Sequence, residues 1–159
     1  MIRFLKLLQQ DDFERSFDQK DFDLMGRCLC DKVFCDYSSL RGDTPAELTA
    51  EEYVEKRRVA AADLKMQHSF SNLVLFGAKD SLTGTCDFKI LRFSLDDFFH
   101  SFGTYTVAFN YVDCRWKIRS IVQKVLKNIG NPELHKGIKS ESSSYHLRLN
   151  KNKTYGKGF

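Results

Sequence analysis

The sequence lacks any long apolar run. No stretch of its 159 residues approaches the roughly 20 apolar residues that a membrane-spanning helix needs. Its first residues, MIRFLKLLQQDDF, form too short an apolar segment and turn acidic too quickly for a secretory signal. Hydrophobic residues make up 42% of the chain and charged residues 29%, a balance typical of a globular protein. We therefore expect a cytoplasmic protein with a substantial core and no membrane contact.

The sequence also lacks paired cysteine spacing. Three of its five cysteines fall in the segment CLCDKVFC, but no two form a CxxC pair and no histidine lies nearby. Structural zinc sites use such pairs. In a reducing compartment, isolated cysteines behave as small buried hydrophobic residues. We therefore expect no metal site.

Most of the chain has no excess of either charge. Residues 131–159 contain six Lys or Arg and two Glu, and so carry the whole net charge of +4, which leaves 19 basic and 19 acidic side chains in residues 1–130. A basic tail rich in Ser, Lys and Asn is more typical of a solvated or subunit-covering segment than of a nucleic-acid reader. We therefore divide the chain into a domain, 1–130, and a C-terminal tail, 131–159, and expect no nucleic-acid binding.

Local patterns predict helices first and strands afterwards. Apolar spacing favours an amphipathic helix over residues 2–17, and Asp21 can cap a second helix that runs through Leu29. Thr49 and Glu52 have capping-box spacing at the start of a third helix. Alternation predicts strands near 32–40, 66–76, 82–93, 102–112 and 115–127, with RGDTPAE as a loop after the first. This order predicts an α+β fold, in which a cone-shaped, curved antiparallel or mixed sheet packs against N-terminal helices and encloses a hydrophobic pocket.

One predicted strand carries a histidine that needs a partner. In KMQHSFSNLVLF, residues 65–76, alternation places His68, Phe70 and Asn72 on one face. A buried polar group without a hydrogen bond costs roughly 1–3 kcal/mol, so His68 must find one. From the residues alone, a core histidine bonded for structural reasons and a functional histidine both remain open.

Four segments, in order, resemble the SnoaL-like branch of the nuclear-transport-factor-2-like superfamily, and are most similar to the scytalone dehydratase group. They are FERSFDQKDFDLMGRCLCDKVFCDYSSL, LTAEEYVEKRR, LKMQHSFSN and GTYTVAFNYVDCRWKI, and the similarity spans about residues 10–125. It implies the cone fold for residues 1–130 and a homo-oligomer, either dimer or trimer. Members include dehydratases, isomerases, cyclases and epoxide hydrolases, and also proteins with no known catalysis, so the fold does not fix the reaction.

The resemblance implies three catalytic residues. His68 matches the dehydratase base, Asp18 matches the aspartate that hydrogen-bonds this histidine, and Tyr37 matches a tyrosine that reaches the substrate carbonyl through water. An imidazole titrates near neutral pH, a carboxylate partner fixes its tautomer, and a phenol can stabilise an enolate oxygen. The three groups suffice for proton abstraction next to a carbonyl. Two alternatives stay open: Asp18 as a cap of the second helix, and Tyr37 as a plain core residue.

The sequence departs from the dehydratase pattern at several polar positions. Phe17 stands where the dehydratases have a second tyrosine. Their second histidine falls near Ser94 or Leu95, and His100 lies a few residues too late to replace it. Gly103 and Tyr105 replace a serine and an asparagine. These departures imply a substrate other than scytalone.

The remaining predictions concern the ligand. With 14 phenylalanines in the chain, we expect a hydrophobic or aromatic small molecule. Arg92 and Lys124 are candidates to meet an acidic ligand group, although we favour solvated surface positions for both. The predicted function is a lyase (dehydratase), isomerase or cyclase without metal or organic cofactor; the alternative is a non-catalytic pocket protein that binds a hydrophobic small molecule or a protein partner. The substrate-binding residues that we predict are Phe17, Tyr53, Phe70, Asn72, Phe88 and Tyr105.

Overall fold

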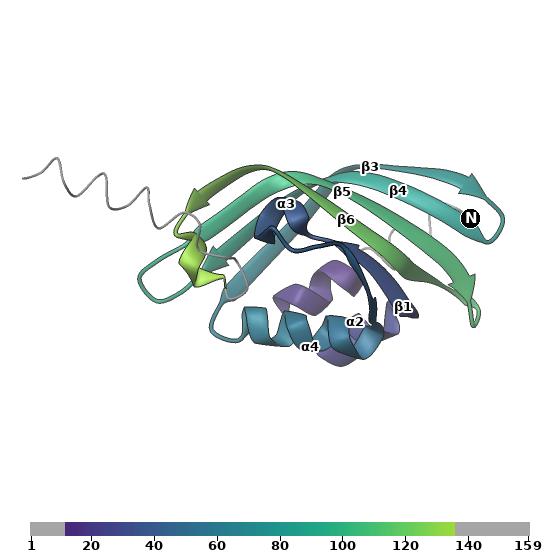
Figure 1. Ribbon diagram of the computed structural model, residues 1–159, viewed down its shortest axis with the longest axis horizontal. Coiled ribbons are helices and arrows are strands. Elements are labelled where there is room, and N and C mark those ends of the chain that lie inside the picture. Colours follow the sequence, from purple (N-terminus) through teal and green to yellow (C-terminus); the bar gives the residue numbers. More distant parts are fainter. Residues whose placement is uncertain (1–11, 136–159) are drawn as a thin grey trace, which may run out of the picture.

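A curved six-stranded sheet with helices on one face forms the protein (Figure 1). The computed structural model describes residues 12–135. Residues 12–18 are helical. They are followed by α2 (Phe22–Arg27), β1 (Leu29–Asp36), α3 (Ser38–Arg41), β2 (Ala46–Thr49), α4 (Ala50–Ala61), β3 (Lys65–Ala78), β4 (Ser81–Phe93), β5 (Phe99–Val112), β6 (Arg115–Gly130) and the 3-10 helix η1 (Pro132–Leu134). The predicted α+β class is confirmed.

The sheet is mixed, with the strand order β2-β1-β6-β5-β4-β3. The strands β3 to β6 follow one another as antiparallel neighbours and agree with the four consecutive strands predicted from alternation. The strand β1 lies parallel to β6 and antiparallel to the short edge strand β2. The strand predicted over 32–40 is shorter at its C-terminal end, because the Asp36 side chain accepts hydrogen bonds from the backbone and hydroxyl of Ser38 and starts α3.

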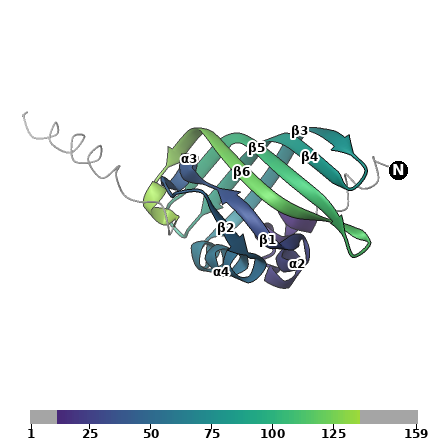
Figure 2. The same ribbon diagram turned by 45° about the vertical axis from the view of Figure 1, so that its right-hand side comes forward.

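The helices follow their capping signals and cover one face of the sheet (Figures 1 and 2). Asp21 caps α2 by accepting from the backbone of Leu24 at 2.9 Å. This helix ends before the predicted Leu29, because Leu29 pairs with β6 instead. The capping box of Thr49 and Glu52 starts α4 as predicted. Residues 2–11 of the first predicted helix lie outside the described residues.

The core fills the space between the helices and the sheet. Met25, Val33 and Tyr53 are fully buried there. Cys28, Cys35 and Cys86 are also buried, as expected, and burial raises the pKa of each of their thiols to about 11. The expectation is wrong for the other two cysteines, since Cys30 is half-buried and Cys114 is exposed. No helix within the described residues is long and apolar enough to cross a membrane.

The chain turns back toward the domain after β6. Gly130 has a φ of +99°, and a Cβ there would lie 2.2 Å from the Phe98 carbonyl oxygen, so the turn requires glycine. Asn131 then donates from its side chain to Asp97 and from its backbone to Phe98, each at 2.8 Å. The first residues of the predicted tail, 131–135, therefore pack on the domain. The rest of it, 136–159, lies outside the described residues.

Candidate functional site

A histidine and an aspartate from distant parts of the sequence form a bonded pair. His68 of β3 is only 6% exposed. Its Nδ1 lies 2.7 Å from Asp18 Oδ1, and its backbone N–H donates to the same carboxylate at 2.9 and 3.1 Å. Asp21, not Asp18, caps α2. The Asp18 carboxylate is therefore the hydrogen-bond partner that the sequence required for His68.

This contact sets the tautomer and the charge of the imidazole. A carboxylate accepts, so Nδ1 carries the hydrogen and Nε2 keeps its lone pair. Burial lowers the pKa of His68, while the hydrogen bond and charge of Asp18 oppose that shift. The Arg92 charge lowers the pKa further. His68 is therefore neutral near pH 7 and carries a free basic nitrogen.

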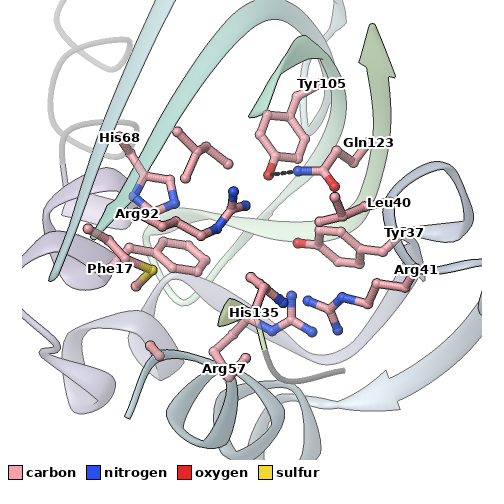
Figure 3. A pocket seen from close by; sticks show the side chains of 14 residues that line it. Phe17, Tyr37, Leu40, Arg41, Arg57, His68, Arg92, Tyr105, Gln123 and His135 are labelled. Carbon is pink, nitrogen blue, oxygen red and sulfur yellow. Dashed lines mark hydrogen bonds between the residues drawn. The ribbon is translucent and has the colours of Figure 1, made fainter. Parts of the chain in front are cut away.

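His68 lines a pocket between the sheet and α4 (Figure 3). The cavity that remains between the side chains has a volume of about 30 Å³, which is space for roughly two water molecules. A larger ligand needs some lining side chains to move. The apolar lining residues are Phe17, Leu40, Ala60, Ala61, Met66 and Ile90, and the polar or aromatic ones are Tyr37, Arg41, Arg57, His68, Arg92, Tyr105, Gln123 and His135.

Tyr37 lines the same pocket at the end of β1. Its hydroxyl oxygen lies 2.7 Å from that of Tyr53 on α4. The guanidinium carbons of Arg57 and Arg41 lie 4.7 and 5.1 Å from the centre of its ring. Burial raises the pKa of Tyr37 well above its usual value, so the phenol stays protonated. When Tyr53 donates to Tyr37, the hydrogen of Tyr37 is available to a ligand.

Two more of the predicted ligand-binding residues reach the pocket. The Phe17 ring packs against the His68 ring with 4.6 Å between centres. Tyr105 of β5 accepts a hydrogen bond from Gln123 Nε2 at 2.6 Å, as Figure 3 shows. Together with Tyr37 and His68, these residues bring four predicted site residues around one cavity.

The other predicted ligand-binding residues do not line the pocket. Tyr53 supports Tyr37 from behind. The rings of Phe70 and Phe88 pack against Tyr105, 5.7 and 4.7 Å from its centre. Asn72 lies in a bulge of β3, where its φ of +54° breaks the alternation that placed it on the His68 face. Its exposed side chain donates to Asp87 at 2.6 Å.

Arg92 corrects one expectation, since the predicted surface position is wrong. Its side chain lies inside the protein, with 2% exposure, and donates from Nη1 to Ser101 Oγ at 2.9 Å. Lys124 is exposed as expected. The site residues predicted from the sequence did not include Arg41, Arg57 and His135, which also line the pocket. Arg57 lies four residues after the buried Tyr53, a helical spacing that could have revealed its inward position.

The residues that the structure describes do not include a metal-binding cluster. No group of three or more His, Cys, Asp or Glu side chains within residues 12–135 could hold a metal ion.

The fold is shared with solved structures of low sequence identity, whereas no protein-family model and no curated protein matches the sequence. The Kfla4162 protein of Kribbella flavida has a TM-score of 0.78 and 18% identity, over 83% of this chain and 95% of that chain. A Novosphingobium aromaticivorans protein provisionally described as a scytalone dehydratase has a TM-score of 0.68 and 12% identity, over 76% and 81%. A hexachlorocyclohexane dehydrochlorinase, LinA type 2, has a TM-score of 0.69 and 14% identity, over 81% and 88%.

These similarities establish the fold. Other matching structures are named as nuclear-transport-factor-2-like proteins. The chain therefore has the nuclear-transport-factor-2-like fold, and the resemblance identified from its sequence is confirmed at that level. Proteins that are named as enzymes therefore occur with this fold.

Proposed function

We propose that the protein is a SnoaL-like lyase or isomerase that abstracts a proton next to a carbonyl group without a metal or organic cofactor. The supporting observation is the contact between His68 Nδ1 and Asp18, which leaves the other ring nitrogen of a buried imidazole basic at the wall of a pocket. A general base needs a free lone pair, a fixed direction and access to the substrate, and the pair supplies the first two.

His68 acts as the base in the proposed reaction. Its Nε2 takes the proton from the carbon, and the imidazolium that forms is stabilised by the Asp18 carboxylate at 2.7 Å. The negative charge moves to the carbonyl oxygen, where Tyr37 donates a hydrogen bond. His68 then returns the proton, either to a leaving hydroxyl group, which gives elimination, or to another carbon, which gives isomerisation.

The Arg92 charge has two opposite effects on this step. It lowers the pKa of His68, which makes the imidazole a weaker base in the resting protein. It also stabilises the enolate, because the negative charge appears only as the proton leaves. The two effects oppose each other, so Arg92 favours catalysis only where the enolate oxygen lies closer to its charge than the imidazolium does.

Two of the similar structures are named for eliminations, since one is provisionally described as a dehydratase and the other is a dehydrochlorinase. Both names describe loss of a small molecule from adjacent carbons. Both eliminations require a base that removes a proton from carbon, which is the role proposed for His68, although hexachlorocyclohexane has no carbonyl group. The names are consistent with the proposal to that extent.

The test is hydrogen exchange, which needs no knowledge of the final product. The full chain is incubated in deuterated buffer with a panel of cyclic and aromatic ketones, and loss of the proton signal next to the carbonyl is followed by NMR. We expect exchange with the wild type and a loss of roughly 10²–10⁴-fold in His68→Gln. Gln67→Ala, an exposed neighbour in β3, is the control and should keep the wild-type rate.

The rival function is a non-catalytic pocket protein, and the same variants separate the two. A binding protein would show no exchange with any ketone above the buffer rate, and His68→Gln would change ligand affinity only modestly. Thermal unfolding of His68→Gln must remain cooperative for the comparison to count. Exchange that persists in this variant would refute the assignment of His68 as the base.

A further inference from the structure

Four basic side chains from four separate elements meet in the pocket. Arg41 comes from the end of α3, Arg57 from α4, Arg92 from the end of β4 and His135 from the residue after η1. Arg57, Arg92 and His135 are 6%, 2% and 7% exposed, and Arg41 is half-buried. Figure 3 shows the side chains of Arg41, Arg57 and His135 on the side of the pocket away from His68, with Arg92 between.

Among the described residues these guanidinium groups form no ion pair with a carboxylate, although the more distant charge of Asp43 acts on Arg41. Within residues 12–135, none of the three arginines lies within ion-pair distance of an Asp or Glu. Their neutral contacts are the Ser101 hydroxyl at Arg92 and the faces of aromatic rings. Cation–π contacts contribute about 0.5–2 kcal/mol each, whereas burying an unpaired charge costs several kcal/mol.

Unpaired polar atoms gather at the same place. Five buried side-chain nitrogen or oxygen atoms in the described part of the chain have no hydrogen-bond partner. Four of them belong to residues that line this pocket, and they are Arg41 Nε, Arg57 Nε, Gln123 Oε1 and His135 Nδ1. Buried polar groups in native proteins are nearly always satisfied, so this concentration indicates a binding site for a polar group.

The charges also act on one another. Burial lowers the pKa of Arg92 to about 10, and the charges of Arg41 and Arg57 act in the same direction. Burial and the charges of Arg92, Arg41 and Arg57 lower the pKa of His135 to about 2. His135 is therefore neutral at pH 7, and the pocket holds three positive charges that repel one another.

We infer that the pocket binds a small organic anion, whose carboxylate or phosphate group lies among Arg41, Arg57 and Arg92 and whose carbon body lies against the apolar wall beside His68. The planar guanidinium forks match both oxyanions with paired hydrogen bonds. The apolar wall includes Phe17 and Met66. The identification of this anion as a substrate rests on the proposed function, whereas the anion site itself would also serve a non-catalytic binding protein.

The small cavity is compatible with such a ligand, because the arginine side chains themselves fill much of the pocket. The Arg41 guanidinium is half-buried and stacks on Tyr37 at 5.1 Å. Arginine has a long flexible side chain, so rotation of Arg41 enlarges the cavity without moving the backbone. An entering oxyanion then replaces the repulsion among the guanidinium groups with attraction.

The first test compares a charged probe with its neutral counterpart. The full chain is titrated by calorimetry with benzoate, phenyl phosphate, inorganic phosphate and benzamide. We expect benzoate or phenyl phosphate to bind, with benzamide at least about 30-fold weaker. Preference between the two aromatic anions identifies the head group, and weaker binding of inorganic phosphate supports the role of the apolar wall. Equal affinity for benzoate and benzamide, or no binding of any anion, overturns the inference.

The second test removes the charges one at a time. Arg57→Met and Arg92→Met keep an unbranched apolar stem but remove the guanidinium group, and should each weaken binding of the preferred anion at least about 30-fold. Arg57→Lys keeps the charge but loses the fork, and should give an intermediate loss. Arg58→Met is the matched control, because Arg58 is the next residue of α4, is exposed and pairs with Glu55. Unchanged anion affinity in folded Arg57→Met and Arg92→Met contradicts the site; where Arg57→Met does not fold, unchanged affinity in Arg57→Lys contradicts it.

His68→Gln separates this inference from the proposed function. We expect this variant to bind the anion nearly as well as the wild type while it loses proton exchange. Anion binding without exchange in the wild type would support the site and remove the catalytic proposal. Exchange on neutral ketones that is insensitive to Arg57→Met and to added benzoate would support the base and overturn the anion site.

Discussion

The pocket contains two buried histidines whose surroundings are opposite. His68 has a carboxylate at 2.7 Å from Nδ1, and this contact opposes the loss of basicity that burial causes. Nδ1 of His135 has no hydrogen-bond partner in the described part of the chain, and three arginine charges act on the ring. The two imidazoles are 6% and 7% exposed. Equal burial therefore leaves one histidine able to accept a proton and the other locked in its neutral form.

The comparison shows that neighbouring charges, and not burial, make the two imidazoles differ in their ability to carry a positive charge. Both side chains lose water to a similar extent, so desolvation lowers both pKa values. At one end of the pocket, the Asp18 carboxylate stabilises a positive charge on the His68 imidazole. At the other end, the arginine side chains would stabilise a negative charge on a ligand. A pocket with these two ends suits a substrate that is anionic at one end and loses a proton at the other.

The largest expected effect comes from removing the carboxylate. In Asp18→Asn the amide can donate to Nδ1 of His68, which stabilises the tautomer with the hydrogen on the wrong nitrogen. We expect proton exchange to fall by roughly 10²–10⁴-fold. The matched control is Asp21→Asn three residues later, because asparagine caps a helix about as well as aspartate. Wild-type exchange in Asp18→Asn, measured by the NMR assay above, would contradict the base assignment.

The arginine side predicts a gain in stability when a charge is removed. Without an added anion, Arg57→Met relieves the repulsion and the desolvation cost of a 6% exposed guanidinium group. We expect the free energy of unfolding to rise at low salt, by up to roughly several kcal/mol, the effective cost of burying one ion. Addition of the preferred anion should make the wild type more stable than Arg57→Met, because the anion binds and stabilises the wild type much more strongly than the variant.

The measurement is thermal unfolding with and without the anion. Arg58→Met, which loses an exposed pair with Glu55, should change stability little in either condition. If Arg57→Met is less stable than the wild type without anion and remains so with it, the stacking on Tyr37 at 4.7 Å outweighs the repulsion, and the proposed balance of charges is wrong.

The next effect is a loss of protein stability in acid, which we expect from His135. The pKa of His135 is lowered from an ordinary 6.5 to about 2 in the folded protein. Below pH 6.5 the unfolded chain therefore binds a proton at this residue that the folded protein does not bind. The free energy of unfolding therefore falls by up to about 1.4 kcal/mol per pH unit as the pH decreases below 6.5. His68 adds a decrease of the same sign.

Urea unfolding of wild type and His135→Gln over this range tests the effect. Glutamine does not titrate, so the variant should lose stability less steeply as the pH falls. The difference between the two proteins at about pH 8, where both histidines are neutral, reports packing alone and serves as the control. Parallel curves would show that His135 is protonated in the folded protein.

Local signals predicted most of this fold. The alternation of residues 66–127 and the capping box at Thr49 gave four strands and one helix, because these patterns depend on neighbours in sequence. The parallel pairing of β1 with β6 depends on contacts distant in sequence. So do the contact of Asn131 with Asp97 and the position of His135 in the pocket. The basic composition beyond residue 130 predicted a solvated or subunit-covering tail, but no local pattern indicated these particular contacts.

For the candidate site, too, local patterns were informative and contacts distant in sequence were not predictable from them. The contact between Asp18 and His68 was predicted from the resemblance to a family, because residues 50 positions apart leave no local pattern. The buried position of the Arg92 side chain could not be predicted from the charge of the residue, because arginine is usually exposed. Asn72 shows the reverse error, since strict alternation fails at a bulge that the sequence does not announce.

The smallest effect concerns Asn72, which lies on β3 with His68 but outside the pocket. In Asn72→Gly the φ of +54° becomes a conformation that the residue adopts without steric strain. The exposed side-chain hydrogen bond to Asp87 is lost. The two changes oppose each other, so we expect the free energy of unfolding to stay within about 0.5 kcal/mol. Proton exchange and anion affinity should be unchanged, because neither end of the pocket contacts this side chain. A marked loss of either in a stably folded variant would show that the ligand extends along β3 to the bulge.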